Sequence, residues 1–398
     1  MPGLQGLQGR LPGQGGHGQL QGGVPAPLLP GRPWARLRQA YALGLIPAWA
    51  RLASRAPGLA NFASHAPLLG RAVKLAGGVA QRRSAPRFAA QTFTAWFGGH
   101  VPRDESAPPV LLWPDTFTNY FEPDVGKAAV ETLEAAGFRV TLPAGSVCCG
   151  RPLYDYGMLG LARRYLLRTL DTLRPQLEAG VPVVGLEPSC LAVFRDELAN
   201  MLPGNLDAQR LKAQSYVLSE FLAEHAPGFV PPRLERTALV QPHCHHHSVI
   251  GFDAEQQLLT SLGLEVQMPD AGCCGMAGSF GYEAGERYRV SMQAGERKLL
   301  PAVREAAEDT LIIADGFSCR GQIAAGTDRR ALHLAQVLQL AVREGSRGPA
   351  ASPPEAVIPE ASADGHQGRK AGAIAAGAIA AGAAAAGAAV VIRRMSRA

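Results

Sequence analysis

Cysteine is the residue of this chain most able to do chemistry, and six of its seven cysteines fall into one pattern that the sequence carries twice. In each copy an adjacent cysteine pair precedes a glycine, in the motif CCG, and a single cysteine follows further along. The two copies comprise Cys148, Cys149 and Cys190, and then Cys273, Cys274 and Cys319. A pattern repeated over this length is typical of one supersecondary unit built twice. The gathered thiols indicate a metal or metal–sulfur site.

The second copy has the fuller set of metal ligands, because Cys244 precedes it where the first copy has Thr116. Four thiolates are the usual complement of an iron–sulfur cluster. Gly272 and Gly275 flank the cysteine pair, and glycine lets backbone amides approach a cluster and tune its potential. We also expect this turn to lead into a helix whose N-terminal dipole favours an anionic cluster. The main predicted site therefore consists of Cys244, Cys273, Cys274 and Cys319.

The first copy is one thiol short, so it predicts a weaker second site at Cys148, Cys149 and Cys190. The hydroxyl of Thr116, the carboxylate of Asp115 or a ligand from outside the chain would complete it. Such a site is degenerate or vestigial.

Three other interpretations of the cysteines stay open. Zinc is one, because histidine and cysteine together suit it, although the chain lacks the CxxC spacing of structural zinc sites. A second is thiol–disulfide chemistry, with Cys273 or Cys274 as the attacking thiolate. The third treats the cysteines as small buried hydrophobes, which the duplicated pattern disfavours. The zinc hypothesis draws on the histidines around Cys244, namely His243, His245, His246 and His247.

Among the histidines we single out His245 as a residue that would support the cluster ligands by hydrogen bonding. The isolated histidines carry no predicted function; they are His17, His65, His100, His225, His333 and His366.

Composition excludes several classes of protein. The chain has 398 residues and a net charge of +6, without a basic stripe interleaved with aromatics, so we expect no nucleic-acid partner. An odd number of cysteines, four of them in adjacent pairs, fits a disulfide framework poorly. The start of the chain has no apolar run typical of a secretory signal. We therefore expect the reducing cytoplasm.

Strands alternate with helices through the middle of the chain, which predicts an α/β fold with parallel sheets. The strands VLLW, FRVTL and VPVVGL precede the first cysteines, and TALVQ, LEVQM and TLIIA precede the second. A long helix is expected after Cys274 and a final helix after Cys319. Because ligands of parallel sheets collect at the carboxyl ends of the strands, the cysteines should meet at that edge.

The predicted organisation has six parts. A helical arm, broken at Pro47, should pack on the main body; its alternative is a surface that meets a membrane or a partner domain. The apolar stretch near the end is long enough to span a bilayer, but alanine and glycine insert weakly, so we expect a low-complexity tail. The parts are a disordered extension (1–33), the arm (34–106), a first repeat (107–205), a helix with a Pro-rich linker (206–235), a second repeat (236–345) and the tail (346–398).

No phosphate-binding loop of the GxGxxG or GxxxxGKS kind and no GxSxG elbow stands in a convincing context. The sequence therefore predicts no flavin or nicotinamide site of its own. It favours a protein that holds redox centres and leaves substrate chemistry to another domain.

The duplicated CCG units resemble the cysteine-rich domains of heterodisulfide reductase and of the glycolate oxidase iron–sulfur subunit. A closer resemblance is to the C-terminal portion of FAD-linked D-2-hydroxyacid dehydrogenases of the D-lactate and D-2-hydroxyglutarate type. It is carried by LLWPDTFTNYF, CCGRPLYDYGML, EPSCLAVFRDEL, HCHHHS, GCCGMAGSFGYE and ADGFSCRGQI, and covers roughly residues 34–342.

The resemblance implies two pseudo-repeated CCG domains after a helical arm, with an iron–sulfur cluster of the 4Fe-4S type on the second-copy cysteines. The flavin and ferredoxin-like domains of that family have no counterpart here, so FAD would lie on a partner flavoprotein domain or subunit. Electrons would pass to a quinone or another carrier, with the arm a candidate for peripheral contact at the inner face of a membrane. The alternatives are a catalytic protein of the heterodisulfide reductase type and a zinc-stabilised module without redox activity.

Overall fold

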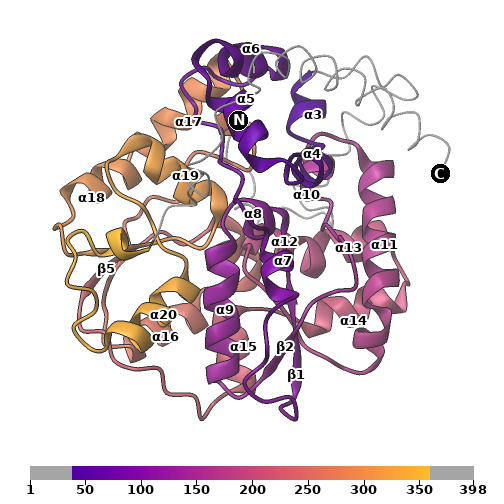
Figure 1. Cartoon of the computed structure of the whole chain (residues 1–398), viewed down its shortest axis with the longest axis vertical. Helices are drawn as coiled ribbons and strands as arrows, with labels where there is room; N and C mark the ends of the chain where they lie inside the picture. The colour runs from indigo at the N-terminus through magenta and orange to yellow at the C-terminus, as the bar shows by residue number, and fades with distance from the viewer. Residues whose placement is uncertain (1–37, 359–398) are drawn as a thin grey trace, which may run out of the picture.

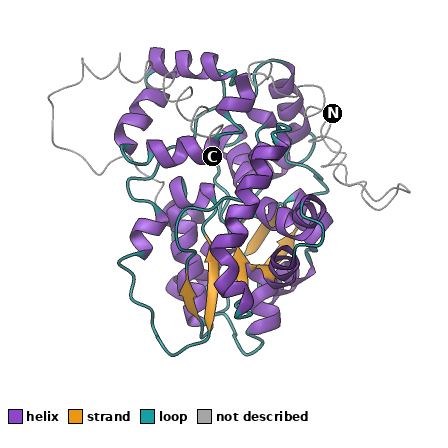
Figure 2. Ribbon diagram, turned by 90° about the vertical axis from the view of Figure 1, so that its right-hand side faces the viewer, coloured by secondary structure: helices purple, strands orange, loops and turns teal. Residues whose placement is uncertain are grey.

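The computed structural model describes residues 38–358. It is an α/β structure with two parallel sheets, helices around them and a helical arm at one end (Figures 1 and 2). The predicted fold class is confirmed. The strands are β1 (Pro109–Trp113), β2 (Arg139–Thr141), β3 (Val183–Gly185), β4 (Ser215–Val217), β5 (Thr237–Val240), β6 (Glu265–Gln267) and β7 (Leu311–Ile313).

The two sheets repeat one topology. The first has the order β2-β1-β3-β4 and the second the order β6-β5-β7, with every pair parallel. Leu112 lies opposite Val184 in the first sheet, as Leu239 lies opposite Ile312 in the second. The strands are short and mostly buried, as strands covered by helices on both faces should be. All carboxyl ends within a sheet therefore point to one edge.

Helices of the first half cover its sheet. The longest, α11, buries leucines at three- and four-residue spacing, and α9 ends just before Gly137, whose φ of +90° glycine adopts readily. Both helices lie where the sequence predicts them. The elements are α8 (Thr116–Tyr120), α9 (Pro123–Ala135), α10 (Arg151–Asp155), α11 (Leu159–Glu178), α12 (Pro188–Ala192), η3 (Val193–Glu197), α13 (Leu198–Met201), α14 (Leu206–Gln214) and α15 (Leu218–His225).

Residues 206–235 differ from the prediction of a helix and a linker. A fourth strand, β4, separates α14 from α15 and pairs with β3. The second half has a single-residue counterpart of β4, because Leu332 makes a parallel bridge to Ile313 just before α20. No turn residue separates β4 from α14 or from α15, so the sequence does not mark where the first helix ends and the strand begins.

The second half carries the elements η4 (His246–Ile250), α16 (Asp253–Ser261), η5 (Phe280–Tyr282), α17 (Glu286–Glu296), α18 (Leu299–Glu305), α19 (Phe317–Gly326) and α20 (Leu334–Glu344). The prediction of one long helix after Cys274 is wrong. A turn and η5 come first, and the helical segment then breaks at Lys298, whose φ is −148°. Pro301 follows in the first turn of α18, where the missing N–H is tolerated, whereas it would break a continuing helix.

The arm consists of short helices: α3 (Arg38–Ala42), α4 (Ile46–Ala53), α5 (Pro57–His65), α6 (Pro67–Gly77) and α7 (Phe93–Phe97). Pro47 lies in the first turn of α4, directly after the break between α3 and α4. The arm packs on the main body, as expected. The Phe93 ring is fully buried against Gly126 of α9, and the Arg83 guanidinium donates to the carbonyl of Gly281 at 2.9 Å.

One hydrophobic core joins the two halves. It includes Leu133 of α9, Phe221 of α15, Val240 of β5 and Leu338 of α20. The helices α9 and α20 lie side by side in the lower half of the view in Figure 1. Burial of this surface fixes the two sheets relative to each other.

The beginning of the predicted tail is part of the fold. Glu355 is buried and pairs with Arg329 at 2.7 Å, and Arg236 donates to the carbonyls of Arg347 and Pro349. The predicted extension (1–33) and the apolar stretch near residue 380 lie outside the described residues. Within residues 38–358, no helix has both the length and the apolar character that a bilayer crossing requires.

The anchoring of the arm can be tested with two phenylalanines. Phe93→Ala should lower the free energy of unfolding by about 3–5 kcal/mol, because a buried ring is replaced by a cavity. Phe62→Ala is the control, since that side chain is 58% exposed on α5, and its effect should be within about 0.5 kcal/mol. Urea unfolding measures both. Equal effects would contradict the packing of the arm described above.

Candidate metal centre

The cysteines of the second half come from three strand ends. Cys244 follows β5, the pair Cys273–Cys274 lies in the loop after β6, and Cys319 sits in the first turn of α19 after β7. All seven cysteines lie within the described residues and are unbridged. The parallel topology thus delivers the thiols to the predicted edge of the sheet.

The four second-half sulfurs contact one another in a row. Cys273 is next to Cys244 and Cys274, and Cys274 is next to Cys319. The neighbouring Cys273 thiol, together with burial, raises the pKa of Cys244 well above its ordinary value. The two neighbouring thiols lower the pKa of Cys273 far below that value. The structure therefore brings together the four thiols predicted for the main site.

The first-half thiols also meet. The Sγ atoms of Cys149 and Cys190 are 3.0 Å apart, and Cys148 contacts Cys149. The Thr116 hydroxyl lies close to Cys148, and the Gly150 amide donates to the same sulfur at 3.4 Å. Thr116 thus occupies the place where the second half has Cys244.

A single cavity of about 1420 Å³ borders both sets of cysteines. Its walls are largely apolar and include residues from the two halves and from the arm, among them Ile46 and Val79. The arm therefore lies over the edge where the strands end (Figures 1 and 2). Cysteines from both halves line the cavity, namely Cys148, Cys149, Cys190, Cys244, Cys273 and Cys274.

Arg151 links the two sets and was not singled out from the sequence. It directly follows the first CCG motif, and its buried guanidinium pairs with Glu197 and with Asp155 at 3.0 Å. Its Nη2 donates to Nε2 of His245 at 2.9 Å. A buried cation near Cys149 and Cys244 favours thiolates and anionic clusters. The signal in the sequence is its position: arginine follows the first CCG, where methionine follows the second.

The histidines beside Cys244 have distinct surroundings. The ligand atoms of His243, Cys244 and His245 all lie within 4.8 Å of one another, which gives the zinc hypothesis a geometric basis. Burial lowers the pKa of His243 to about 4. His245 hydrogen-bonds Arg151, and His247 is exposed.

The helix that was expected to begin directly after the second CCG motif, with its N-terminal dipole at the cluster, begins further along the chain. The helix that follows the second CCG motif, α17, begins only at Glu286, after the turn and η5. The glycine-rich segment GMAGSFG lies between the CCG motif and α17. Glycine disfavours helix, so a segment with three glycines delays the start of the helix. The helix that begins at the site is α19, whose first turn holds Cys319.

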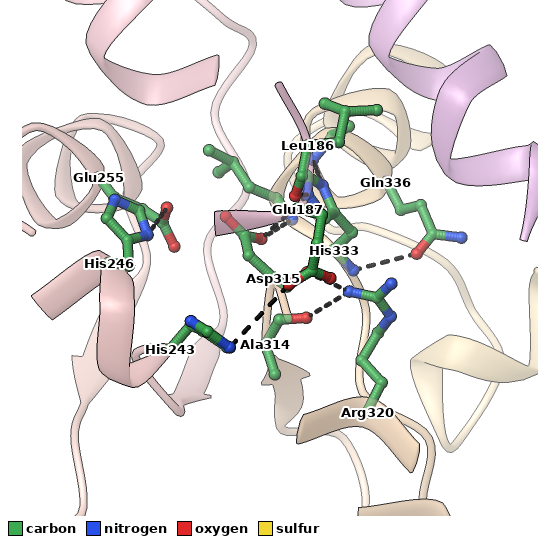
Figure 3. Close-up of polar contacts among 12 residues, drawn as sticks. Leu186, Glu187, His243, His246, Glu255, Ala314, Asp315, Arg320, His333 and Gln336 are labelled. Atoms are coloured by element: carbon green, nitrogen blue, oxygen red, sulfur yellow. Dashed lines mark hydrogen bonds and ion pairs between the residues drawn. The ribbon is translucent and has the colours of Figure 1, made fainter. Parts of the chain in front are cut away.

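Buried polar contacts join the two halves near the ends of β3 and β7 (Figure 3). The Phe317 amide donates to the Glu187 carboxylate at 2.9 Å, and Nε2 of His333 lies 2.9 Å from the carbonyl of Leu186. Arg320 binds Glu122 at 2.5 Å. In the sequence, only the position of Glu187, three residues before Cys190, could have indicated that it lies near the site. His333 was interpreted as an isolated histidine.

The residues present fit an iron–sulfur cluster. The donors are four thiols in a row, soft ligands that select such clusters, zinc or copper(I). Two sets of three donors among the described residues have all their ligand atoms within 4.8 Å, and neither contains more than one cysteine. The four sulfurs are therefore spread more widely than the donor atoms of those two sets, each of which is compact enough for a single metal ion.

Comparison with known proteins agrees with the duplicated pattern. A family model described as a cysteine-rich domain, CCG, matches residues 115–195 and 252–324. The two matches fall on the first and second halves and include the CCG motifs with the cysteines that follow them.

Three relatives show how widely this unit is used. One of the proteins that make up anaerobic glycerol-3-phosphate dehydrogenase of Escherichia coli is 27% identical over 65% of this chain and 66% of its own. D-2-hydroxyglutarate dehydrogenase of Pseudomonas putida is 31% identical over 59% of this chain, but this chain spans only 22% of that protein. Lactate utilization protein A of Bacillus licheniformis is 31% identical over 58% of this chain and 98% of its own length. The chain belongs to the family of CCG cysteine-rich proteins that includes lactate utilization protein A.

Proposed function

We propose that the chain is an iron–sulfur electron-transfer module of a flavin-dependent D-2-hydroxyacid dehydrogenase. Cys244, Cys273, Cys274 and Cys319 would hold a cluster of the 4Fe-4S type. The observation that carries the proposal is the row of four thiols from three strand ends, three of which line one cavity. Membership in the CCG family supports the same assignment.

A weaker second site is proposed at the first-half cysteines, Cys148, Cys149 and Cys190. The Thr116 hydroxyl contacts Cys148, but a neutral hydroxyl is a poorer ligand for iron than a thiolate. Occupancy there should therefore be lower than in the second half.

The proposed partner is a flavoprotein domain or subunit that carries FAD. Support comes from relatives that are a dehydrogenase and a component of another dehydrogenase. On the partner, a hydroxyacid would lose a hydride from C2 to the flavin and a proton from its hydroxyl, leaving the oxoacid. The two electrons would then leave singly through this chain to a quinone or another carrier, in the cytoplasm or at the inner face of the membrane.

The residues of this chain would hold and tune the centre. A bound cluster supplies a one-electron carrier. The buried Arg151 guanidinium would favour the anionic forms of both sites, and the Gly275 amide, which donates to the Cys273 sulfur at 3.3 Å, would stabilise charge on that sulfur. The apolar walls of the cavity would keep the centre away from bulk water.

A second candidate function is reduction of a small disulfide at the same cavity. The observation that favours it is that one cavity borders both sets of thiols, which leaves room for a molecule between them. The same preparation can test both functions.

We also propose two functional units, residues 107–205 and 236–345. The segment 206–235 that joins them adds the strand β4 and the helix α15 to the first unit.

The two glycines of the second CCG turn give a matched pair of variants. Both have positive φ, +93° at Gly275 and +62° at Gly272, so alanine strains the backbone at each. A Cβ at Gly275 would lie 2.2 Å from the Ser291 carbonyl oxygen, whereas the nearest atom at Gly272 is 4.0 Å away. Gly275→Ala should therefore lose most of the bound iron and Gly272→Ala much less, as measured by iron content per chain. Similar losses would refute the role of this close approach.

The ranking of the two cysteine sets is tested by serine substitution. Cys274→Ser should remove most of the bound iron, because a cluster left with three thiolates is labile. Cys148→Ser should remove little, because its site is the weaker one. Iron and acid-labile sulfide analysis of anaerobic preparations measures both, and equal losses would contradict the ranking.

Electron transfer can be tested on the full chain without the native partner. Photoreduced FAD should reduce the anaerobic protein, and menadione, a soluble quinone, should reoxidise it; Cys274→Ser should do neither efficiently. Glutathione disulfide is the competing acceptor. Rapid reoxidation by the disulfide but not by menadione would overturn the electron-transfer assignment in favour of the second candidate.

A further inference from the structure

A second cluster of potential metal ligands lies in the core of the second half, and it contains no cysteine. Its members are His246 at the start of η4, Glu255 of α16 and Asp315 just after β7. Their side chains are only 1%, 2% and 6% exposed. One imidazole nitrogen and one oxygen of each carboxylate all lie within 4.8 Å of one another.

The polar atoms of this cluster are poorly satisfied. Neither ring nitrogen of His246 has a hydrogen-bond partner among the described residues, and neither does Oε2 of Glu255. His246 Nδ1 lies 3.5 Å from that oxygen, and Figure 3 shows the two side chains facing each other. A buried polar atom without a partner costs about 1–3 kcal/mol, so three together indicate a missing ligand.

The neighbouring His333 does not complete the cluster. Its Nδ1 accepts from the Ala335 amide at 3.0 Å, and its Nε2 lies 2.9 Å from the carbonyl of Leu186. Its Nε2 also lies 3.6 Å from Oδ1 of Asp315, which accepts from the Leu334 amide at 2.8 Å. His333 is therefore already engaged, and it positions Asp315 from behind.

We propose that His246, Glu255 and Asp315 bind one divalent first-row transition-metal cation of the zinc class. One imidazole and two carboxylates form a donor set that zinc accepts, whereas calcium and magnesium prefer oxygen alone. Two carboxylates this close in a buried site repel each other, and a divalent cation neutralises them.

The position of the proposed ion gives it a structural role. His246 follows Cys244 by two residues, and Asp315 precedes Cys319 by four. A cation bound to both, and to α16 through Glu255, would fix the two loops that bring these cysteines to the thiol row. The zinc-class site is distinct from the iron–sulfur site, because it uses nitrogen and oxygen donors only.

The test is metal analysis of the full chain, purified anaerobically and soaked with Zn²⁺, followed by X-ray absorption at the zinc edge. We expect one zinc per chain with nitrogen and oxygen ligands at about 2.0–2.2 Å, whereas zinc on the cysteines would show sulfur at about 2.3 Å. Only sulfur ligands, or no retained zinc, would overturn the proposal. This measurement needs no substitution and is independent of folding of any variant.

Two nearly isosteric variants then assign the ligands. Glu255→Gln and Asp315→Asn should each lose the nitrogen- and oxygen-bound zinc, and the zinc-dependent rise in melting temperature with it. His247→Gln is the control, because His247 is the exposed neighbour of His246, and it should keep both. Zinc retained at the wild-type level by Glu255→Gln and Asp315→Asn would mean that other residues bind it, and would overturn the proposal.

Discussion

The parallel pairing of short buried strands is the constraint on which the rest of this structure depends. β1 holds β2 and β3 in parallel, and β5 holds β6 and β7 in the same order. Every loop that carries a cysteine leaves the carboxyl end of one of these strands. Residues far apart in the chain, such as Cys244 and Cys319, therefore meet without any disulfide to join them.

The two halves are held together by a shared apolar core and by buried polar contacts near the thiols. The shared core around α9 and α20 supplies most of the free energy, since burial of apolar surface is the main driving force. The contacts of Arg151 with His245 and of Glu187 with the Phe317 amide lie closer to the thiols. A hydrogen bond fixes the relative orientation of the two groups that it joins, whereas apolar packing does not. These contacts therefore hold the cysteines of the two halves in a fixed arrangement.

The sequence was informative where a pattern repeats and uninformative where a partner lies far along the chain. The alternation of strands and helices along the chain, and helices such as α9 and α11, follow from local spacing, and the structure agrees. β4 was missed because it directly adjoins α14 and α15, with no turn residue to mark its ends. The helix after Cys274 was predicted as continuous, because hydrophobic spacing does not register the break at Lys298.

The buried ionisable residues illustrate the second limit. His333 looked isolated in the sequence, but it contacts Leu186, which lies 147 positions away, and Asp315. Arg151 pairs with Glu197 and His245, again across long separations. Burial and partner choice are set by tertiary packing, so no spacing rule could identify these residues from one sequence.

The most direct test of the central claim is the content of iron, acid-labile sulfide and zinc per chain in anaerobically purified protein. If the second-half cysteines hold a 4Fe-4S cluster, iron and sulfide should be present in equal amounts, near four of each per chain when that site is full. Sulfur-bound zinc with neither iron nor sulfide would contradict the account.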